Sequence, residues 1–136
     1  MKASNEVPPI TNAEAAGTGK GTFTLDVTRD SAGKITAAKG TLAVTLSGFP
    51  ATVTPIVGFH IHNAPAGTNA GVVVNSGVAA SAPVQFTSGS ATITKADITV
   101  DPALAELIIA NPAGYYFNAH TQLNPGGAVR GQLVKF

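Results

Sequence analysis

The feature that most constrains the fold is a series of short runs in which apolar and polar residues alternate, separated by frequent glycine and proline. Residues 22–28 and 41–46 alternate strictly, which is the pattern of strands with one buried face. The side chains predicted to face the core are Phe23, Leu25, Val27, Leu42, Val44 and Leu46. Fifteen glycines and nine prolines in 136 residues supply turns for many such strands. We therefore predict that these two runs pair antiparallel around a turn at residues 30–33.

Further strands are predicted along the rest of the chain from the same signals. They cover residues 34–38, 53–63, 72–74, 84–86, 91–94, 115–120 and 129–136. Pro55 interrupts one of them, which indicates an edge strand or a bulge at that point. Residues 64–71 combine glycine, proline and asparagine and are predicted to form a loop.

One helix is predicted to begin at Asp101, because aspartate caps free N–H groups and Pro102 suits the first helical position. Its predicted apolar face consists of Leu104, Leu107 and Ile108, and Asn111-Pro112 ends it. The expected architecture is all-β: an antiparallel Greek-key β-sandwich or barrel, immunoglobulin-like or superoxide dismutase-like, with one short helix. We expect a single domain over residues 1–136.

Composition excludes several classes of function. Eight basic and seven acidic residues give a net charge of +1, so no basic stripe for nucleic acid can form. No apolar run reaches the ~18 residues of a membrane span. Without cysteine, the chain has no disulfide, zinc finger, iron–sulfur cluster or thiol nucleophile.

The low charged fraction of 11% is typical of an exported protein. The first residues are polar and contain no apolar leader segment, so we expect Met1 to stand where a leader has been removed. The expected location is secreted, periplasmic or at the cell surface.

All three histidines lie in two strand-like segments, 58–63 and 116–121. His60 and His62 are two residues apart and share a face of their strand, while Phe59 and Ile61 point to the core. Two neutral imidazoles at this spacing can chelate one metal ion, with His120 as a third ligand if its strand lies alongside. The alternative is that these histidines only hydrogen-bond neighbouring loops.

Arg130 follows the turn at residues 124–127, which returns its strand to the strand of His120. Arg130 either steers an anion or, the favoured interpretation, anchors loop carbonyls through hydrogen bonds. Glu6 lies in an extended segment that closes over the sandwich or supplies a carboxylate to the histidines. Candidates to surround the histidine site are Glu6, Asn63, Asn118 and Thr121.

Across nearly its whole length the sequence resembles a CHRD domain, the domain named after chordin. The motifs that carry the resemblance are residues 5–9, 58–62, 71–74, 116–121 and 125–133. The family pattern usually has glutamate before the hydrophobic-Arg-Gly of the last motif, where this chain has Ala128. The resemblance implies an extracytoplasmic β-sandwich and leaves its activity open.

Residues 58–62 are also similar to the copper-ligand strand of copper/zinc superoxide dismutases. A centre with two metals needs about six histidines and an aspartate, and this chain has three histidines. A two-metal dismutase is therefore excluded, and a single copper on His60, His62 and His120 is not.

Three functions follow from these observations. The first is an exported module that binds a transition metal, copper before zinc, for storage, delivery or resistance. The second is a metal-free structural or adhesion module of a secreted protein. The third is a mononuclear copper redox enzyme with superoxide dismutase-like activity. The sequence names no protein partner.

Overall fold

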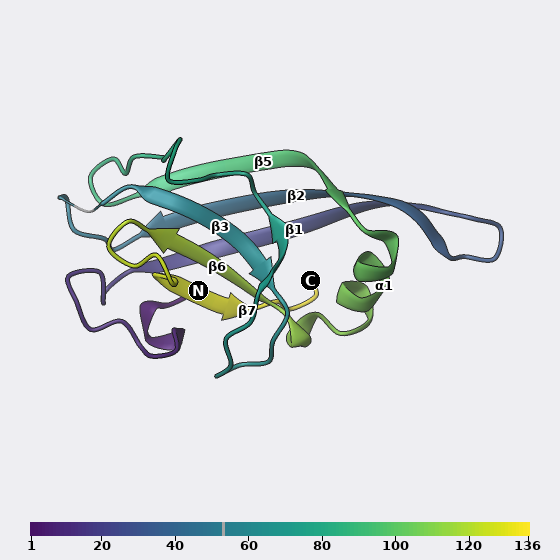
Figure 1. Ribbon diagram of the computed structural model, residues 1–136, viewed down its shortest axis with the longest axis horizontal. Helices are drawn as coiled ribbons and strands as arrows, with labels where there is room; N and C mark the ends of the chain where they lie inside the picture. The colour runs from purple at the N-terminus through teal and green to yellow at the C-terminus, as the bar shows by residue number, and fades with distance from the viewer. Residues whose placement is uncertain (53) are drawn as a thin grey trace.

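The computed structural model describes residues 1–52 and 54–136, which form two antiparallel sheets packed face to face (Figure 1). The first sheet has the order β1-β2-β5, with strands β1 (Thr18–Arg29), β2 (Ile35–Ser47) and β5 (Ala91–Val100). The second has the order β4-β3-β6-β7, with strands β4 (Val72–Asn75), β3 (Ile56–His62), β6 (Tyr116–Thr121) and β7 (Val129–Gln132).

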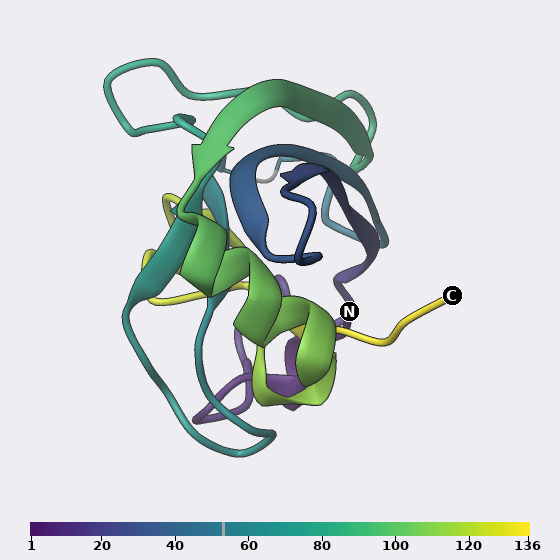
Figure 2. The same ribbon diagram turned by 90° about the vertical axis from the view of Figure 1, so that its right-hand side faces the viewer.

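The chain crosses between the sheets after β2, after β4 and after β5, as in a Greek-key sandwich. The predicted all-β sandwich with one short helix is thereby confirmed. The helix α1 (Pro102–Ala110) covers one end of the sandwich, as Figure 2 shows, and 3₁₀ turns occur at η1 (Ala3–Asn5) and η2 (Pro112–Gly114). No helix in the described part of the chain is long and apolar enough to cross a membrane.

The core lies between the two sheets and takes alternate residues from each strand. Phe59 and Ile61 of β3 are fully buried, as their alternation with the histidines predicts. Phe59 stacks on Phe117 of β6 with ring centroids 6.1 Å apart. Opposite them, β2 contributes Leu42, Val44 and Leu46, all buried. Full burial of each such side chain stabilises the fold by about 1.5–3 kcal/mol.

The β1–β2 hairpin confirms the predicted antiparallel pairing and its turn. The Asp30 carboxylate accepts hydrogen bonds from the backbone N–H groups of Ala32 and Lys34, and Gly33 adopts a positive φ of 84°. The separate strand predicted at residues 34–38 is instead the start of a continuous β2. A bulge between Gly40 and Leu42 lets the strand continue, and a side chain at Gly40 would meet the Phe23 ring.

The helix begins as predicted: the Asp101 carboxylate accepts a hydrogen bond from the Leu104 N–H, and Pro102 occupies the first turn. The predicted apolar face is partly wrong. Ala105 and Ile108 are the buried residues, whereas Leu107 is 59% exposed. The helix packs against β2 along the line through Ala105, so its buried stripe is rotated away from Leu107.

Several strand boundaries differ from the prediction. β5 continues to Val100, β7 ends at Gln132, and residues 84–86 contribute only a bridge between Val84 and Ile56. The edge position expected from Pro55 is wrong, because β3 lies between β4 and β6. Pro55 does not interrupt the strand but directly precedes it, and the nearest irregularity is a register shift between Ile56 and Gly58. Val53, the first residue of the strand predicted at 53–63, lies outside the described residues.

Candidate metal centre

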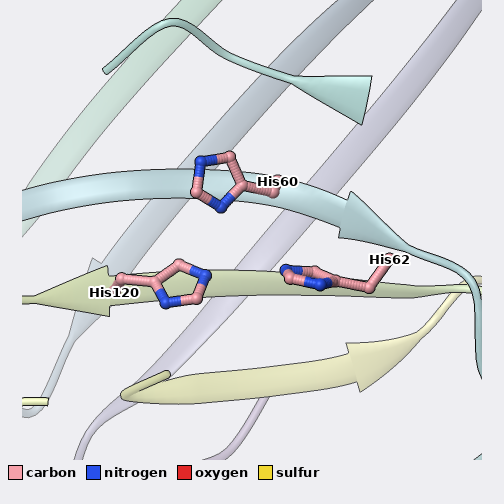
Figure 3. Close-up of side chains that lie close together, drawn as sticks. All are labelled: His60, His62 and His120. Carbon is pink, nitrogen blue, oxygen red and sulfur yellow. The ribbon is translucent and has the colours of Figure 1, made fainter. Parts of the chain in front are cut away.

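The three histidines meet on the outer face of the second sheet, the face turned away from the core (Figure 3). His60 and His62 project from β3, and His120 projects from the neighbouring strand β6. The register places Gly58 opposite His120, which brings the ring of His120 beside those of β3. One ring nitrogen from each histidine lies within 4.8 Å of the other two.

Hydrogen bonds fix the orientation of two of these rings. The Nδ1 atom of His62 lies 2.9 Å from the Ala70 carbonyl oxygen, and Nδ1 of His120 lies 3.0 Å from the Pro125 carbonyl oxygen. Because a carbonyl only accepts, both Nδ1 atoms carry the proton and donate it. The Nε2 atoms of His62 and His120 are therefore unprotonated and free to bind a metal.

Three ring nitrogens are buried without a hydrogen-bond partner among the described residues. They are Nδ1 of His60, Nε2 of His62 and Nε2 of His120. A buried polar atom without a partner costs roughly 1–3 kcal/mol, so native proteins leave few of them. One metal ion would satisfy all three nitrogens at once.

The surroundings keep the three imidazoles neutral. Burial, together with the neighbouring His120 and His62, lowers the pKa of His60 to about 4. Burial also lowers the pKa of His120 to about 4, against the hydrogen bond to the Pro125 carbonyl, which raises it. The pKa of His62 is lowered by the same cause. Neutral imidazole is the form that coordinates a metal.

Gly58 makes room for the His60 ring, a feature that the sequence analysis missed. A Cβ atom at position 58 would lie 2.7 Å from Cε1 and 3.1 Å from Nε2 of His60. Both distances are shorter than ordinary contacts, so any larger residue would displace the ring. The same-face spacing of Gly58 and His60 in the motif Gly58-Phe59-His60 was the available signal.

An aromatic stack supports His62 from the side of β6. The His62 ring lies parallel to the Tyr116 ring, with centroids 4.7 Å apart and an angle of 5° between the planes. The guanidinium carbon of Arg130 lies 4.6 Å from the Tyr116 ring centroid. Tyr116 also accepts a hydrogen bond from the Ala70 N–H, in the loop that orients His62. Sequence reasoning did not single out Tyr116.

Arg130 is buried, and each of its three side-chain nitrogens donates one hydrogen bond. It donates from Nε to Glu6 at 3.1 Å, from Nη1 to the Thr68 carbonyl at 3.0 Å, and from Nη2 to the Asn69 side chain. The arginine thus anchors the loop at residues 64–71, which also supplies the carbonyl that orients His62.

The Glu6 carboxylate lies against Arg130 and takes no place in the histidine cluster. Burial raises the pKa of Glu6 to about 7, even though the charge of Arg130 and hydrogen bonds from Arg130 and Asn118 lower it. Glu6 and Asn118 both lie close to Gly127, where a Cβ atom would come within 3 Å of either side chain. The Glu6–Arg130 ion pair, together with backbone hydrogen bonds between Lys2 and Arg130, holds the N-terminal segment against β7.

The remaining residues predicted to surround the histidines are Asn63 and Thr121, and they lie in different environments. Asn63 is exposed at the end of β3. Thr121 is buried beside His120 and donates a 2.6 Å hydrogen bond to the Glu14 carboxylate.

Glu14 is a buried anchor that sequence reasoning missed. Its carboxylate accepts hydrogen bonds from Thr121, Asn124 and Thr54. Asn124 begins the turn that carries Pro125, the residue whose carbonyl orients His120. Glu14 thus ties the N-terminal segment to the β6–β7 turn.

The donors suit copper or zinc. Three neutral imidazoles bind both ions, and the stability order places copper above zinc.

The sequence profile of the CHRD domain matches residues 1–133, so the chain belongs to the CHRD domain family. No curated protein matches the chain significantly, and neither does any solved structure.

Proposed function

We propose that this CHRD domain binds one transition-metal ion, copper in preference to zinc, through His60, His62 and His120. Its role is to store, deliver or sequester the metal. The observation that carries the proposal is the convergence of three buried ring nitrogens that lack any other partner in the described structure. Carbonyl groups that fix the free nitrogen of two of these rings support it further.

The surroundings of the histidines favour binding over catalysis. A redox enzyme needs an open coordination position and, for an anionic substrate, a free cation near it. The three ring nitrogens are closed to solvent, and Arg130 is engaged by Glu6 and the loop at residues 64–71. We therefore place storage or delivery ahead of superoxide dismutase-like activity.

The test is a titration of the metal-free protein with copper, in each oxidation state, and with Zn(II). We expect one equivalent of copper to bind, and zinc to bind more weakly. His60→Ala, His62→Ala and His120→Ala should each abolish stoichiometric binding. Asn63→Ala is the matched control, since it removes an exposed polar side chain next to His62 and should leave binding intact.

Equal and weak binding by the wild type and the triple histidine variant would contradict the proposal and leave a metal-free structural or adhesion module. Activity of the copper-loaded protein in a dismutase assay would instead favour the enzyme.

We also propose that the protein works outside the cytoplasm. The low charged fraction supports this location. Fractionation of the native cells tests it, and recovery in the cytoplasmic fraction alone would contradict it.

A further inference from the structure

We infer that the three-histidine centre takes copper as Cu(I), with His60 Nδ1, His62 Nε2 and His120 Nε2 as its full set of ligands. The inference rests on the proposed function and adds to it the oxidation state of the metal. Three observations carry it: the number of donors, the exclusion of water, and the lack of a charged ligand.

The number of donors is limited to three. Within residues 1–52 and 54–136, no carboxylate joins the three histidines in a metal-ligating group. The two buried acids nearby are engaged elsewhere, Glu6 with Arg130 and Glu14 with Thr121 and Asn124. The phenol oxygen of Tyr116 accepts from the Ala70 N–H, and the ring of Tyr116 stacks flat on His62.

We expect no water molecule to act as a fourth ligand. All three donor nitrogens are closed to solvent. The loop at residues 64–71 and the turn at residues 124–127 hold His62 and His120 through the Ala70 and Pro125 carbonyl oxygens. Zn(II) in proteins almost always takes four ligands, and Cu(II) favours tetragonal arrangements with four or more. Cu(I) has a filled d shell and no such geometric demand, so three imidazoles satisfy it.

The charge of the site also favours Cu(I). The three ligands are neutral imidazoles, with two protons fixed on Nδ1 by backbone carbonyls. No ligand in the described part of the chain offsets the charge of the ion. Because the cost of burying an ion rises with the square of its charge, a divalent ion costs roughly four times as much as a monovalent one. The site therefore stabilises Cu(I) over Cu(II).

The test compares the affinities of the protein for the two copper ions. Cu(I) is titrated without oxygen in competition with the chromogenic chelator bicinchoninate, and Cu(II) is titrated in air against glycine. We expect Cu(I) to bind at least about a hundredfold tighter than Cu(II), relative to the aquated ions. That ratio raises the potential of the bound couple by about 120 mV above the aquated couple, at 59 mV for each tenfold.

X-ray absorption of the Cu(I)-loaded protein gives an independent readout, and three nitrogen donors are expected. The Asn63→Ala variant should keep both affinities, whereas His60→Ala should lower the Cu(I) affinity, because only two donors remain. Cu(II) binding as tight as Cu(I), or four or more donors to Cu(I), would overturn the inference and leave the proposed function standing. Absence of binding in either oxidation state would overturn both.

Discussion

The outer faces of the two sheets arise from the same alternation of residues, but one face is exposed to water and the other is buried. On the first sheet, the outward side chains are largely threonines open to water, among them Thr24, Thr45, Thr92 and Thr94. On the second sheet, every residue of β6 is buried, including those that face away from the core. Loops and the N-terminal segment cover that face and hold its polar groups by hydrogen bonds.

The covered face is the one on which polar groups are buried and a binding site can form. Covering a polar face is costly, since each buried polar group then needs a partner. On the covered face nearly all of them have one: Glu14 and Arg130 each make three hydrogen-bonding interactions. Among the described residues, five buried side-chain atoms have no partner: Glu6 Oε1, Asn118 Oδ1 and the three histidine nitrogens. Only the histidine nitrogens converge on one point, which is why we propose the metal there.

The largest effect is expected from breaking a buried ion pair. Arg130→Met leaves the Glu6 carboxylate buried without its partner and should lower the free energy of unfolding by about 3–5 kcal/mol. The matched control is Arg29→Met in the pair Arg29–Glu106, which has the same 3.1 Å separation but is 41% exposed on both sides. That change should cost under about 1 kcal/mol. Chemical denaturation measures both, and equal losses would remove the distinction between the two faces.

The next effect, on copper affinity, concerns His120, one of the three proposed ligands. His120→Ala removes one of three donors and should lower copper affinity by at least about a hundredfold, which corresponds to about 2.7 kcal/mol. Thr45→Ala on the open face should leave the affinity unchanged. Competition titration measures the two values. A similar small change in both variants would show that the covered face does not hold the metal.

A smaller loss is expected from crowding the His60 ring. Gly58→Ala places a methyl group 2.7 Å from the ring and should lower copper affinity by about tenfold, the low end of the effect of residues that orient ligands. Gly71→Ala is the control, because a Cβ atom at that position meets open space. If the two variants bind copper equally well, the ring position does not depend on Gly58.

A pH dependence of stability is also expected for the metal-free protein. The pKa of His60 and of His120 is about 4 when folded and about 6.5 when unfolded, so the unfolded chain binds more protons between these values. The stability should therefore fall as the pH drops from 6.5 to 4. The raised pKa of Glu6 changes the stability in the opposite direction. Comparison with a His60→Ala/His120→Ala double variant, which keeps Glu6, cancels this contribution. If the difference in free energy of unfolding between the two proteins stays constant across this pH range, the histidines are not buried in the neutral form.

Much of the sandwich could be predicted from sequence, because alternation and turn residues are local signals. The shared face of His60 and His62 follows from the two-residue period of a strand. The start of α1 follows from Asp101 and Pro102, whereas the exposure of Leu107 depends on how the finished helix sits against β2. Which side of a helix is buried is a property of tertiary packing.

The meeting of His120 with the other histidines could not be derived from alternation alone. It depends on β3 pairing with β6 in the register that sets Gly58 opposite His120, across about sixty residues of sequence. The roles of Glu14 and Tyr116 depend on the same long-range pairing. Glu14 belongs to no local pattern, and the motif that contains Tyr116 does not show what its ring contacts, so only the folded chain brings out these contacts.

The most direct test of the central claim follows the ring nitrogens themselves by NMR. Long-range ¹H–¹⁵N spectra of the three imidazoles are recorded before and after one equivalent of Cu(I), which is diamagnetic. The account predicts that Nδ1 of His60 and Nε2 of His62 and His120 shift together, while Nδ1 of His62 and His120 keep their protons. Stoichiometric binding that leaves these three nitrogens unmoved would contradict it.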